Sequence, residues 1–69
     1  MPPTAAVVLS PRQHEVLVLM SRGVRAREIA AVLGVTQATA RNHIRGVLRR
    51  LDCHSQLEAV GRARECRLL

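Results

Sequence analysis

The chain has 69 residues and a formal net charge of +6, and these two values already limit what it can be. A chain of this length buries roughly 60% of its unfolded surface, enough for one small core but not for a deep substrate cleft beside it. All 11 of its Lys and Arg residues are arginine, and the isoelectric point is about 11.6. This balance indicates a polyanionic partner, most often nucleic acid, with an anionic membrane surface as the competing candidate.

Several classes of protein are disfavoured by the composition. Two cysteines, Cys53 and Cys66, cannot form a disulfide framework, so we expect a reducing, cytoplasmic setting. His54 stands beside Cys53, but no short-spaced ligand pair completes a tetrahedral site, and we expect no metal or other cofactor. The scattered histidines, thiols and acids form no nucleophile–base pattern, so we expect neither an enzyme nor a small-molecule ligand. The longest apolar run, AAVVL, is far too short for a membrane span, which needs roughly 20 residues.

Residues 1–8, MPPTAAVV, are predicted to be a lead-in or the remnant of a linker, followed by one domain at residues 9–69. The first helix of that domain is expected at about residues 11–22. Ser10 and Gln13 have the spacing of a capping box, and proline suits the first helical position between them. A left-handed glycine then ends the helix. Its apolar face is expected to consist of Val16, Leu17, Leu19 and Met20.

A second, shorter helix is expected at about residues 26–33. Arg25 stands at its start, where Ser, Thr, Asp or Asn would be expected as the cap, so this end is predicted to be poorly capped. Gly34 ends the helix. The residues expected to pack are Ile29, Ala30, Val32 and Leu33.

A three-residue link with glycine at its head, Gly34-Val35-Thr36, leads into a third helix at about residues 37–51, and Thr36 is expected to cap this helix. Such a link is typical of the turn in a helix-turn-helix. Asp52 follows at a position that usually takes Gly or Asn in left-handed backbone.

A fourth helix is expected at about residues 56–67, because Ser55 and Glu58 have the spacing of a second capping box. No segment alternates like a strand. The chain is therefore predicted to be all-α, a four-helix bundle with a central helix-turn-helix.

Apolar and charged residues fall on opposite faces of the third helix. At about 100° per residue, one narrow stripe is apolar, with Leu48 at its edge. That stripe consists of Ala40, Ile44, Val47 and Leu51. On the far side lie Arg41, Arg45 and Arg49, with Asn42 beside them. Like charges at this spacing destabilise an isolated helix slightly, so a compensating partner is expected outside the chain.

This basic face is compatible with two interpretations, a solvated surface and a face that binds duplex DNA. A major groove about 12 Å wide admits one helix and is lined by phosphates. Arginine can bind both acceptors of guanine, and asparagine the paired edge of adenine. The tight turn in front of the helix favours DNA. Single-stranded nucleic acid and RNA are disfavoured because no aromatic side chain is present to stack on bases.

Three stretches of the chain then carry a resemblance to a known family. LSPRQHEVLVLMSRG is similar to an opening Leu-Thr-Pro-Arg-Glu-x-Glu-Val-Leu helix, and EIAAVLGVTQATARNHI to a central motif running from Glu-Ile-Ala through Gly-Val-Ser to Thr-Val-Lys-x-His. VLRRLDCHSQLEAV is similar to a closing Lys-Leu-Gly-Val-x-Ser-Arg-x-Glu-Ala-Val motif. From about Leu9 to Leu69 the chain thus resembles the LuxR-type (GerE or FixJ type) helix-turn-helix DNA-binding domain of bacterial transcriptional regulators.

The resemblance implies transcriptional regulation by sequence-specific binding of double-stranded promoter DNA, with the helix from Gln37 to Leu51 in the major groove. It implies a homodimer on DNA through the fourth helix, with RNA polymerase as a further candidate partner. The chain would then be a stand-alone module or the excised C-terminal effector domain of a response regulator.

The same resemblance and the helical spacing predict roles for individual residues. The residues expected to read bases are Arg41, Asn42 and Arg45. Those expected to contact the DNA backbone are Arg25, Arg27, Thr36, Gln37, Thr39, His43 and Arg49. His43 is equally compatible with a hydrogen-bonded position between helices. The residues expected at a dimer interface are Leu57, Val60, Gly61 and Arg64.

The chain departs from the family pattern at three positions. Ala40 replaces a larger valine, Arg25 replaces a capping Ser or Thr, and Asp52 replaces glycine. Two other functions stay open. One is a sigma-factor-like promoter recognition module, although such modules usually end with the recognition helix. The other is a protein-interaction or membrane-surface module using the apolar side of the fourth helix.

Overall fold

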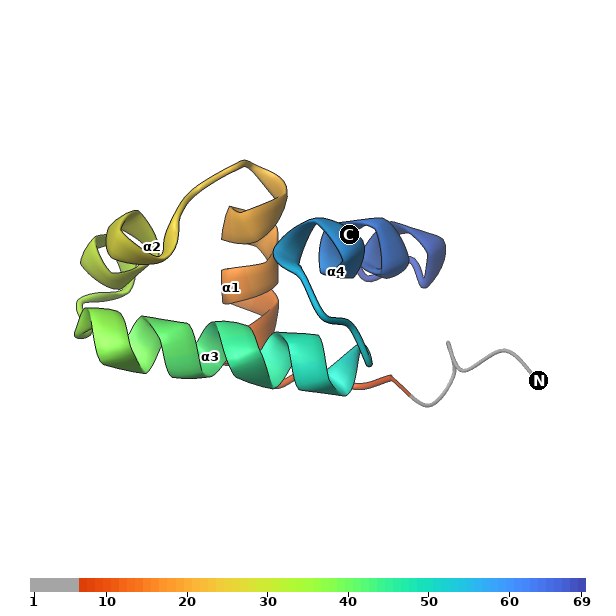
Figure 1. The fold of residues 1–69 in the computed structure, drawn as a ribbon, viewed down its shortest axis with the longest axis horizontal. Coiled ribbons are helices and arrows are strands. Elements are labelled where there is room, and N and C mark those ends of the chain that lie inside the picture. The colour runs from red at the N-terminus through yellow and green to blue at the C-terminus, as the bar shows by residue number, and fades with distance from the viewer. Residues whose placement is uncertain (1–6) are drawn as a thin grey trace.

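The computed structural model describes residues 7–69, which form four helices and no strand. The helices are α1 (Pro11–Ser21), α2 (Ala26–Leu33), α3 (Gln37–Arg50) and α4 (Gln56–Glu65). In Figure 1, α3 runs along one side of the molecule, α1 stands across it, and α2 and α4 lie on either side of α1. The predicted all-α fold with a central helix-turn-helix is confirmed.

The core lies where α3 meets the inner faces of the other three helices. It is entirely non-aromatic, and Leu17, Ile29 and Leu51 are among its largest fully buried side chains. The buried residues are Val16, Leu17, Met20, Ile29, Ala30, Ala40, Ile44, Val47, Leu51, Cys53, Ala59, Val60 and Ala63. Two of them, Ala40 and Val47, are fully buried on α3, so the apolar stripe of that helix is what attaches it to the bundle.

One packing prediction for α2 is wrong. Val32 was expected to pack, but its side chain is 66% exposed. Ile29, Ala30 and Leu33 set the direction in which α2 faces the core. At about 100° per residue, Val32 lies roughly 110° around the helix from that direction, so it points to solvent.

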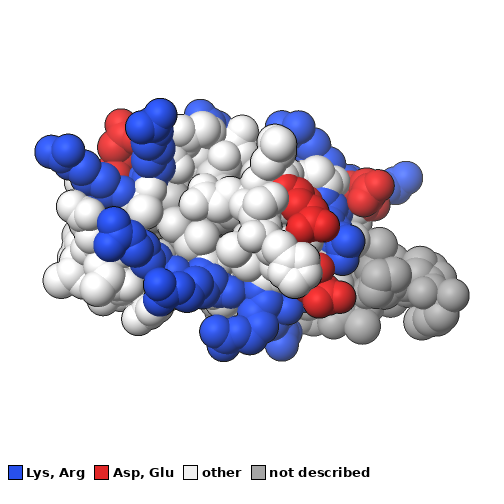
Figure 2. All heavy atoms as spheres, viewed as in Figure 1, with Lys and Arg blue, Asp and Glu red and all other residues white. Residues whose placement is uncertain are grey.

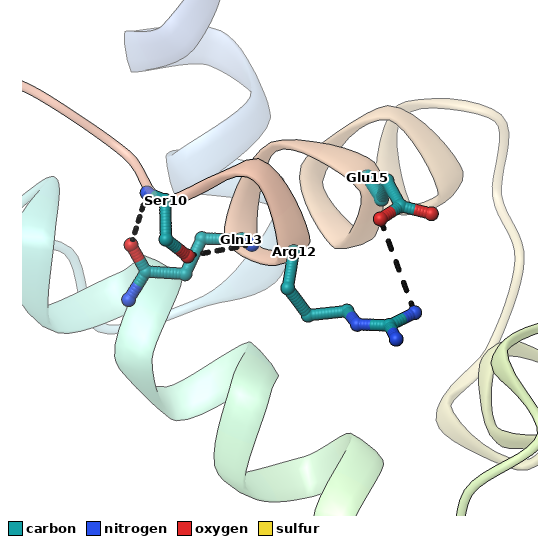
Figure 3. A network of polar contacts seen from close by, with 4 residues as sticks. All are labelled: Ser10, Arg12, Gln13 and Glu15. Atoms are coloured by element: carbon teal, nitrogen blue, oxygen red, sulfur yellow. Dashed lines mark hydrogen bonds and ion pairs between the residues drawn. The ribbon is translucent and has the colours of Figure 1, made fainter.

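The start of α1 has the predicted capping box. The Ser10 hydroxyl oxygen accepts from the Gln13 amide at 3.1 Å, and Gln13 Oε1 accepts from the Ser10 amide at 2.9 Å (Figure 3). The other end of the Gln13 side chain faces α3, where a Cβ on Gly46 would meet Gln13 Nε2 at 3.1 Å. The small residue at position 46 therefore lets the capping side chain lie close against α3.

The predicted box at the start of α4 is only half correct. The Ser55 hydroxyl oxygen accepts from the Glu58 amide at 3.1 Å, as expected. The Glu58 carboxylate, however, accepts from the amide of His54 at 2.8 Å and not from that of Ser55. Ser55 has φ −144°, whereas Ser10 in the complete box has φ −66°. This rotation about the N–Cα bond directs the Ser55 N–H elsewhere.

The start of α2 lacks a side-chain cap, as predicted, because a guanidinium group has no acceptor to offer. The Arg25 amide still donates to Glu28 Oε1 at 3.3 Å, so one of the exposed N–H groups at this end is satisfied.

Each of the four helices ends in a Schellman turn, in which the chain reverses through a left-handed residue and an apolar residue follows. After α1, for example, the Val24 amide donates to the Leu19 carbonyl at 3.1 Å, and Val24 packs on the core. The left-handed residues are Gly23 (φ 79°), Gly34 (φ 69°), Asp52 (φ 55°) and Arg67 (φ 58°). The apolar residues that follow them are Val24, Val35, Cys53 and Leu68.

These turns explain where the helix ends differ from the expected ones. The left-handed conformation at Asp52 ends α3 at Arg50, one residue early. The same conformation at Arg67 ends α4 at Glu65, two residues early. Arginine has no special tolerance of this conformation, so nothing local in the sequence marked the second position.

Most of the predicted lead-in lies outside the described residues, which begin at position 7. Val7 packs against the core and Val8 is exposed. The Val8 carbonyl accepts hydrogen bonds from Nε and Nη2 of Arg50, with the Nε contact at 3.0 Å. Val8 is thus attached to the end of α3.

Candidate nucleic-acid interface

The turn between α2 and α3 fixes the direction of α3. Gly34 takes the left-handed conformation, and the Val35 amide donates back to the Ala30 carbonyl at 3.0 Å. Thr36 then caps α3, its hydroxyl oxygen accepting from the Thr39 amide at 3.1 Å. The Thr36 hydroxyl in turn donates to Thr39 Oγ1 at 2.9 Å, which leaves the Thr39 proton able to reach a group outside the chain. The predicted cap and turn are confirmed.

The predicted division of α3 into two faces is also confirmed. Its apolar stripe is buried, with Ile44 at 4% exposure, whereas Arg41, Asn42 and Arg45 are exposed. Arg49 continues the same exposed row. Figure 2 shows arginine side chains gathered in a band along the edge of the molecule that Figure 1 assigns to α3. We call Arg41, Asn42, Arg45 and Arg49 the outer face of α3.

The predicted backbone contacts surround this outer face. Thr36 and Gln37 are exposed at the start of α3, and Thr39 is half-buried there. His43 is half-buried, so its ring lies at the boundary between the two faces of the helix.

Arg25 and Arg27 are exposed at the start of α2, which packs against α3. Together with Glu28 they line a surface hollow of about 420 Å³. The first turn of α2 therefore offers two cations and unpaired backbone N–H groups, a combination suited to phosphate.

The four residues expected at a dimer interface do not share one environment. Leu57 is 85% exposed, and Gly61 and Arg64 are also exposed on α4. Val60 is only 9% exposed and belongs to the core of the single chain. A hollow of about 350 Å³ between the end of α1 and the start of α4 brings Val60 and Leu57 to one surface.

Two arginines act inside the chain in a way that the sequence did not reveal. Arg62 on α4 donates through Nη1 to the carbonyls of Leu51 at 3.0 Å and Asp52 at 3.3 Å. These carbonyls lie at the end of α3, where helix geometry leaves acceptors unsatisfied and the dipole favours a cation. Arg50 holds the Val8 carbonyl in the same manner. Their partners lie 11 and 42 residues away in sequence, which no local pattern encodes.

A hydrogen bond within the outer face was also not foreseen. Arg45 Nη1 donates to Asn42 Oδ1 at 3.1 Å, one turn back along α3. The spacing of three residues was the available signal, because residues three apart are neighbours on a helix surface.

A further ionisable group, Cys53, lies in the core. Burial raises the pKa of the Cys53 thiol, so this group stays protonated and donates to the Leu51 carbonyl at 3.3 Å. Within residues 7–69, no three His, Cys, Asp or Glu side chains are grouped as metal ligands. None of the helices in this range has the length and apolar character needed to cross a bilayer.

Comparison with known families agrees with this architecture. The model of the bacterial regulatory proteins of the luxR family matches residues 7–63. The chain belongs to the luxR family. It is therefore a helix-turn-helix domain of the kind found in DNA-binding transcriptional regulators.

Several curated proteins are similar to this luxR-family domain over most of its length. The transcriptional activator protein CarR of Pectobacterium carotovorum subsp. carotovorum is 38% identical over 88% of the chain, which is 25% of CarR. The transcriptional regulatory protein DesR of Bacillus subtilis is 37% identical over 83% of the chain and 29% of DesR. The nitrate/nitrite response regulator protein NarP of Escherichia coli is 36% identical over 77% of the chain and 25% of NarP.

The chain thus spans only about a quarter of the length of these relatives. No solved structure matches it.

Proposed function

We propose that this domain binds double-stranded DNA sequence-specifically, with α3 in the major groove, and regulates transcription by doing so. The observation that carries the proposal is the outer face of α3, where Arg41, Arg45 and Arg49 project from a helix whose opposite side is buried. Within the described residues no carboxylate pairs with these three guanidinium groups. Phosphates and guanine edges in a groove about 12 Å wide would supply the missing acceptors.

The exposed residues divide into two kinds of contact. We propose that Arg41, Asn42 and Arg45 face base edges, because they lie on the part of the outer face nearer the start of α3, the end of a recognition helix that contacts bases in helix-turn-helix domains. The proposed backbone contacts are Arg25, Arg27, Thr36, Gln37, Thr39, His43 and Arg49. Their place at the start of α2, the start of α3 and the rim of the outer face supports contact with the sugar-phosphate walls.

Titration of duplex DNA against salt tests the proposal directly. A duplex selected from a random pool should bind the chain with an affinity that falls with log[salt] at a slope of about −0.9 per phosphate neutralised. Arg22→Ala is the matched control, because Arg22 is exposed and directly follows α1, and this end of the helix lies away from α3 (Figure 1). It removes one charge outside the proposed interface and should leave base preference unchanged. Absence of any enriched sequence, together with salt-independent binding, would contradict the proposal.

We further propose that two copies bind DNA together through α4. Leu57 is 85% exposed and lines one surface hollow together with Met20 and Val60, which supports this arrangement because apolar residues gathered at one surface, unlike single exposed ones, are typical of interaction sites. A two-fold dimer would read half-sites separated by about one helical turn.

Analytical ultracentrifugation with and without a palindromic duplex tests the dimer. Leu57→Glu should abolish the dimer while binding to a single half-site persists, and unchanged dimerisation by this variant would rule out the α4 interface. RNA polymerase stays a further candidate partner of such a complex.

A further inference from the structure

The outer face of α3 contains one hydrogen bond between two of its own exposed side chains. Arg45 Nη1 donates to Asn42 Oδ1 at 3.1 Å. The identity of the acceptor atom follows from chemistry, because the amide NH₂ group has no acceptor to offer a guanidinium. Among the hydrogen bonds of residues 7–69, neither side chain has another partner. The two residues therefore form one unit on the surface proposed to face DNA.

This contact leaves the two-donor edge of Arg45 available. A guanidinium group carries five N–H donors in one plane. Because Nη1 holds the Asn42 oxygen, the edge formed by Nε and Nη2 remains intact. That edge has the geometry that binds two acceptors at once, such as O6 and N7 of guanine. The hydrogen bond also restricts the rotation of an otherwise flexible side chain, which lowers the entropy lost on binding.

The same contact changes what Asn42 can read. Binding adenine requires the amide to accept from the N6 amino group and donate to N7 at the same time. In this structure one of the two lone pairs of the amide oxygen accepts from Arg45, and the guanidinium N–H groups beside the other would meet the N6 donor group of adenine. The pair presents mainly N–H groups outward, which matches the two acceptors on the guanine edge.

We propose that Asn42 and Arg45 act as one guanine-reading unit, in which the Asn42 amide oxygen positions the Arg45 guanidinium and reads no adenine of its own. This inference rests on the proposed function and adds a base preference to it. Water leaves the groove when α3 enters, and the contact strengthens in those surroundings because the local dielectric constant falls. Asn42 is then a positioning residue and Arg45 the residue that contacts the base.

Base-preference profiles of single and double variants test the unit. The wild-type site is first selected from a random pool, and each position is then replaced by the three other base pairs. Arg45→Ala should reduce the preference for guanine at one base pair by on the order of ten- to a hundred-fold. Asn42→Ala should reduce the preference at the same base pair by roughly two- to ten-fold. The double variant should be no less selective than Arg45→Ala alone, because coupled residues are not additive.

Asn42→Asp provides the conservative comparison. Its carboxylate keeps an acceptor for Arg45, so the guanine preference should persist while affinity for every sequence falls through repulsion by phosphates. A merely structural role for Asn42 would not reproduce this split between preference and affinity. Both side chains are exposed, so each variant should retain the wild-type circular dichroism spectrum, with Arg22→Ala as the charge-matched control.

Three results would overturn the inference while leaving the proposed function intact. The first is loss of an adenine preference at a different base pair in Asn42→Ala. The second is full additivity of the two single variants. The third is a base profile of Asn42→Ala or Arg45→Ala that equals the wild-type profile. Failure of the wild-type chain to select any duplex sequence would instead reject the proposed function itself.

Discussion

Two groups of arginines in this small domain differ in what their guanidinium groups touch. Arg41 and Arg49 project from the outer face of α3, and no hydrogen bond from their side chains is found within residues 7–69. Arg50, the last residue of α3, donates to the Val8 carbonyl, and Arg62 on α4 donates to the Leu51 carbonyl directly after α3. We call the second group the anchoring arginines. Both groups add equally to the net charge, but only in the first is the whole guanidinium group without a hydrogen-bond partner in residues 7–69.

The comparison shows that net charge alone overstates the surface available to DNA. Arg62 neutralises the carbonyl end of α3 and joins α4 to it, which is a folding role. Arg49 and Arg50 are adjacent in sequence and both exposed, yet Arg50 turns toward Val8 and Arg49 does not. Their roles follow from their angle around the helix, which differs by about 100°.

The largest expected difference between the groups is in base recognition. Arg41→Ala should remove about 1–3 kcal/mol of discrimination at one base pair, because a bidentate contact is lost. The free energy of unfolding should stay close to the wild-type value, since the side chain is exposed and bonds to nothing within the described chain. Competition binding with single-base variants of the selected duplex, paired with urea unfolding, measures both quantities. If Arg41→Ala lowered the free energy of unfolding but left the base preference unchanged, the distinction between outer-face and anchoring arginines would be wrong.

An anchoring arginine should give the opposite pattern. Arg62→Ala removes the guanidinium donor from the carbonyls of Leu51 and Asp52 and leaves only the weaker Cys53 thiol as a donor to Leu51. This loss should cost about 1–2 kcal/mol of folding free energy. Base preference should be unchanged in the fraction that remains folded. Thermal unfolding monitored by circular dichroism tests the first claim, and Arg22→Ala serves as the control for loss of one charge. Altered base preference in folded Arg62→Ala would place this residue in the interface instead.

The features that could be predicted from sequence are those encoded within one helix turn. Ser10 with Gln13, Gly34 and Thr36 each have partners three or four residues away, and the structure confirms the resulting caps and turn. The two faces of α3 follow from periodicity alone. Local patterns thus sufficed for the helices, for the turn and for the direction in which the outer face points.

Most of what could not be predicted depends on contacts between distant segments, although the Arg45–Asn42 hydrogen bond within one turn of α3 was not foreseen either. The role of Arg50 depends on Val8, which lies 42 residues away, and a basic residue at that position is equally compatible with DNA contact. Val32 was misplaced because six of the eight residues of α2 are apolar, so their pattern does not single out one buried side. Arg67 occupies a left-handed position that only the packing of Leu68 explains.

A smaller effect should distinguish phosphate contact from base contact within the outer face. Arg49→Ala should weaken binding to all sequences alike and make the slope of log affinity against log[salt] shallower by about 0.9. Arg50→Ala is the adjacent comparison, and its slope should stay close to that of wild type because the side chain is held by Val8. Titrations at several salt concentrations on one duplex measure both slopes. Equal changes in the two variants would show that Arg50 leaves its anchor and joins the interface.

The smallest expected effect concerns Arg67, an arginine that belongs to neither group. Its backbone has φ 58°, a conformation that costs an L-residue roughly 1–2 kcal/mol but glycine almost nothing. Glycine also gains freedom in the unfolded chain, which offsets part of that difference by about 0.4–1 kcal/mol. Arg67→Gly should therefore raise the free energy of unfolding by roughly 0.5 kcal/mol despite the loss of a charged residue. Affinity for DNA should not change, because the residue follows α4 and lies outside the proposed contacts.

Urea denaturation measures the gain in the free energy of unfolding, with Gly23→Ala as the opposite control. That variant makes the reverse exchange at the same position of the Schellman turn after α1 and should destabilise the domain. If Arg67→Gly instead lost both stability and affinity, the guanidinium of this residue would have a partner of its own, and the division into outer-face and anchoring arginines would need a third role.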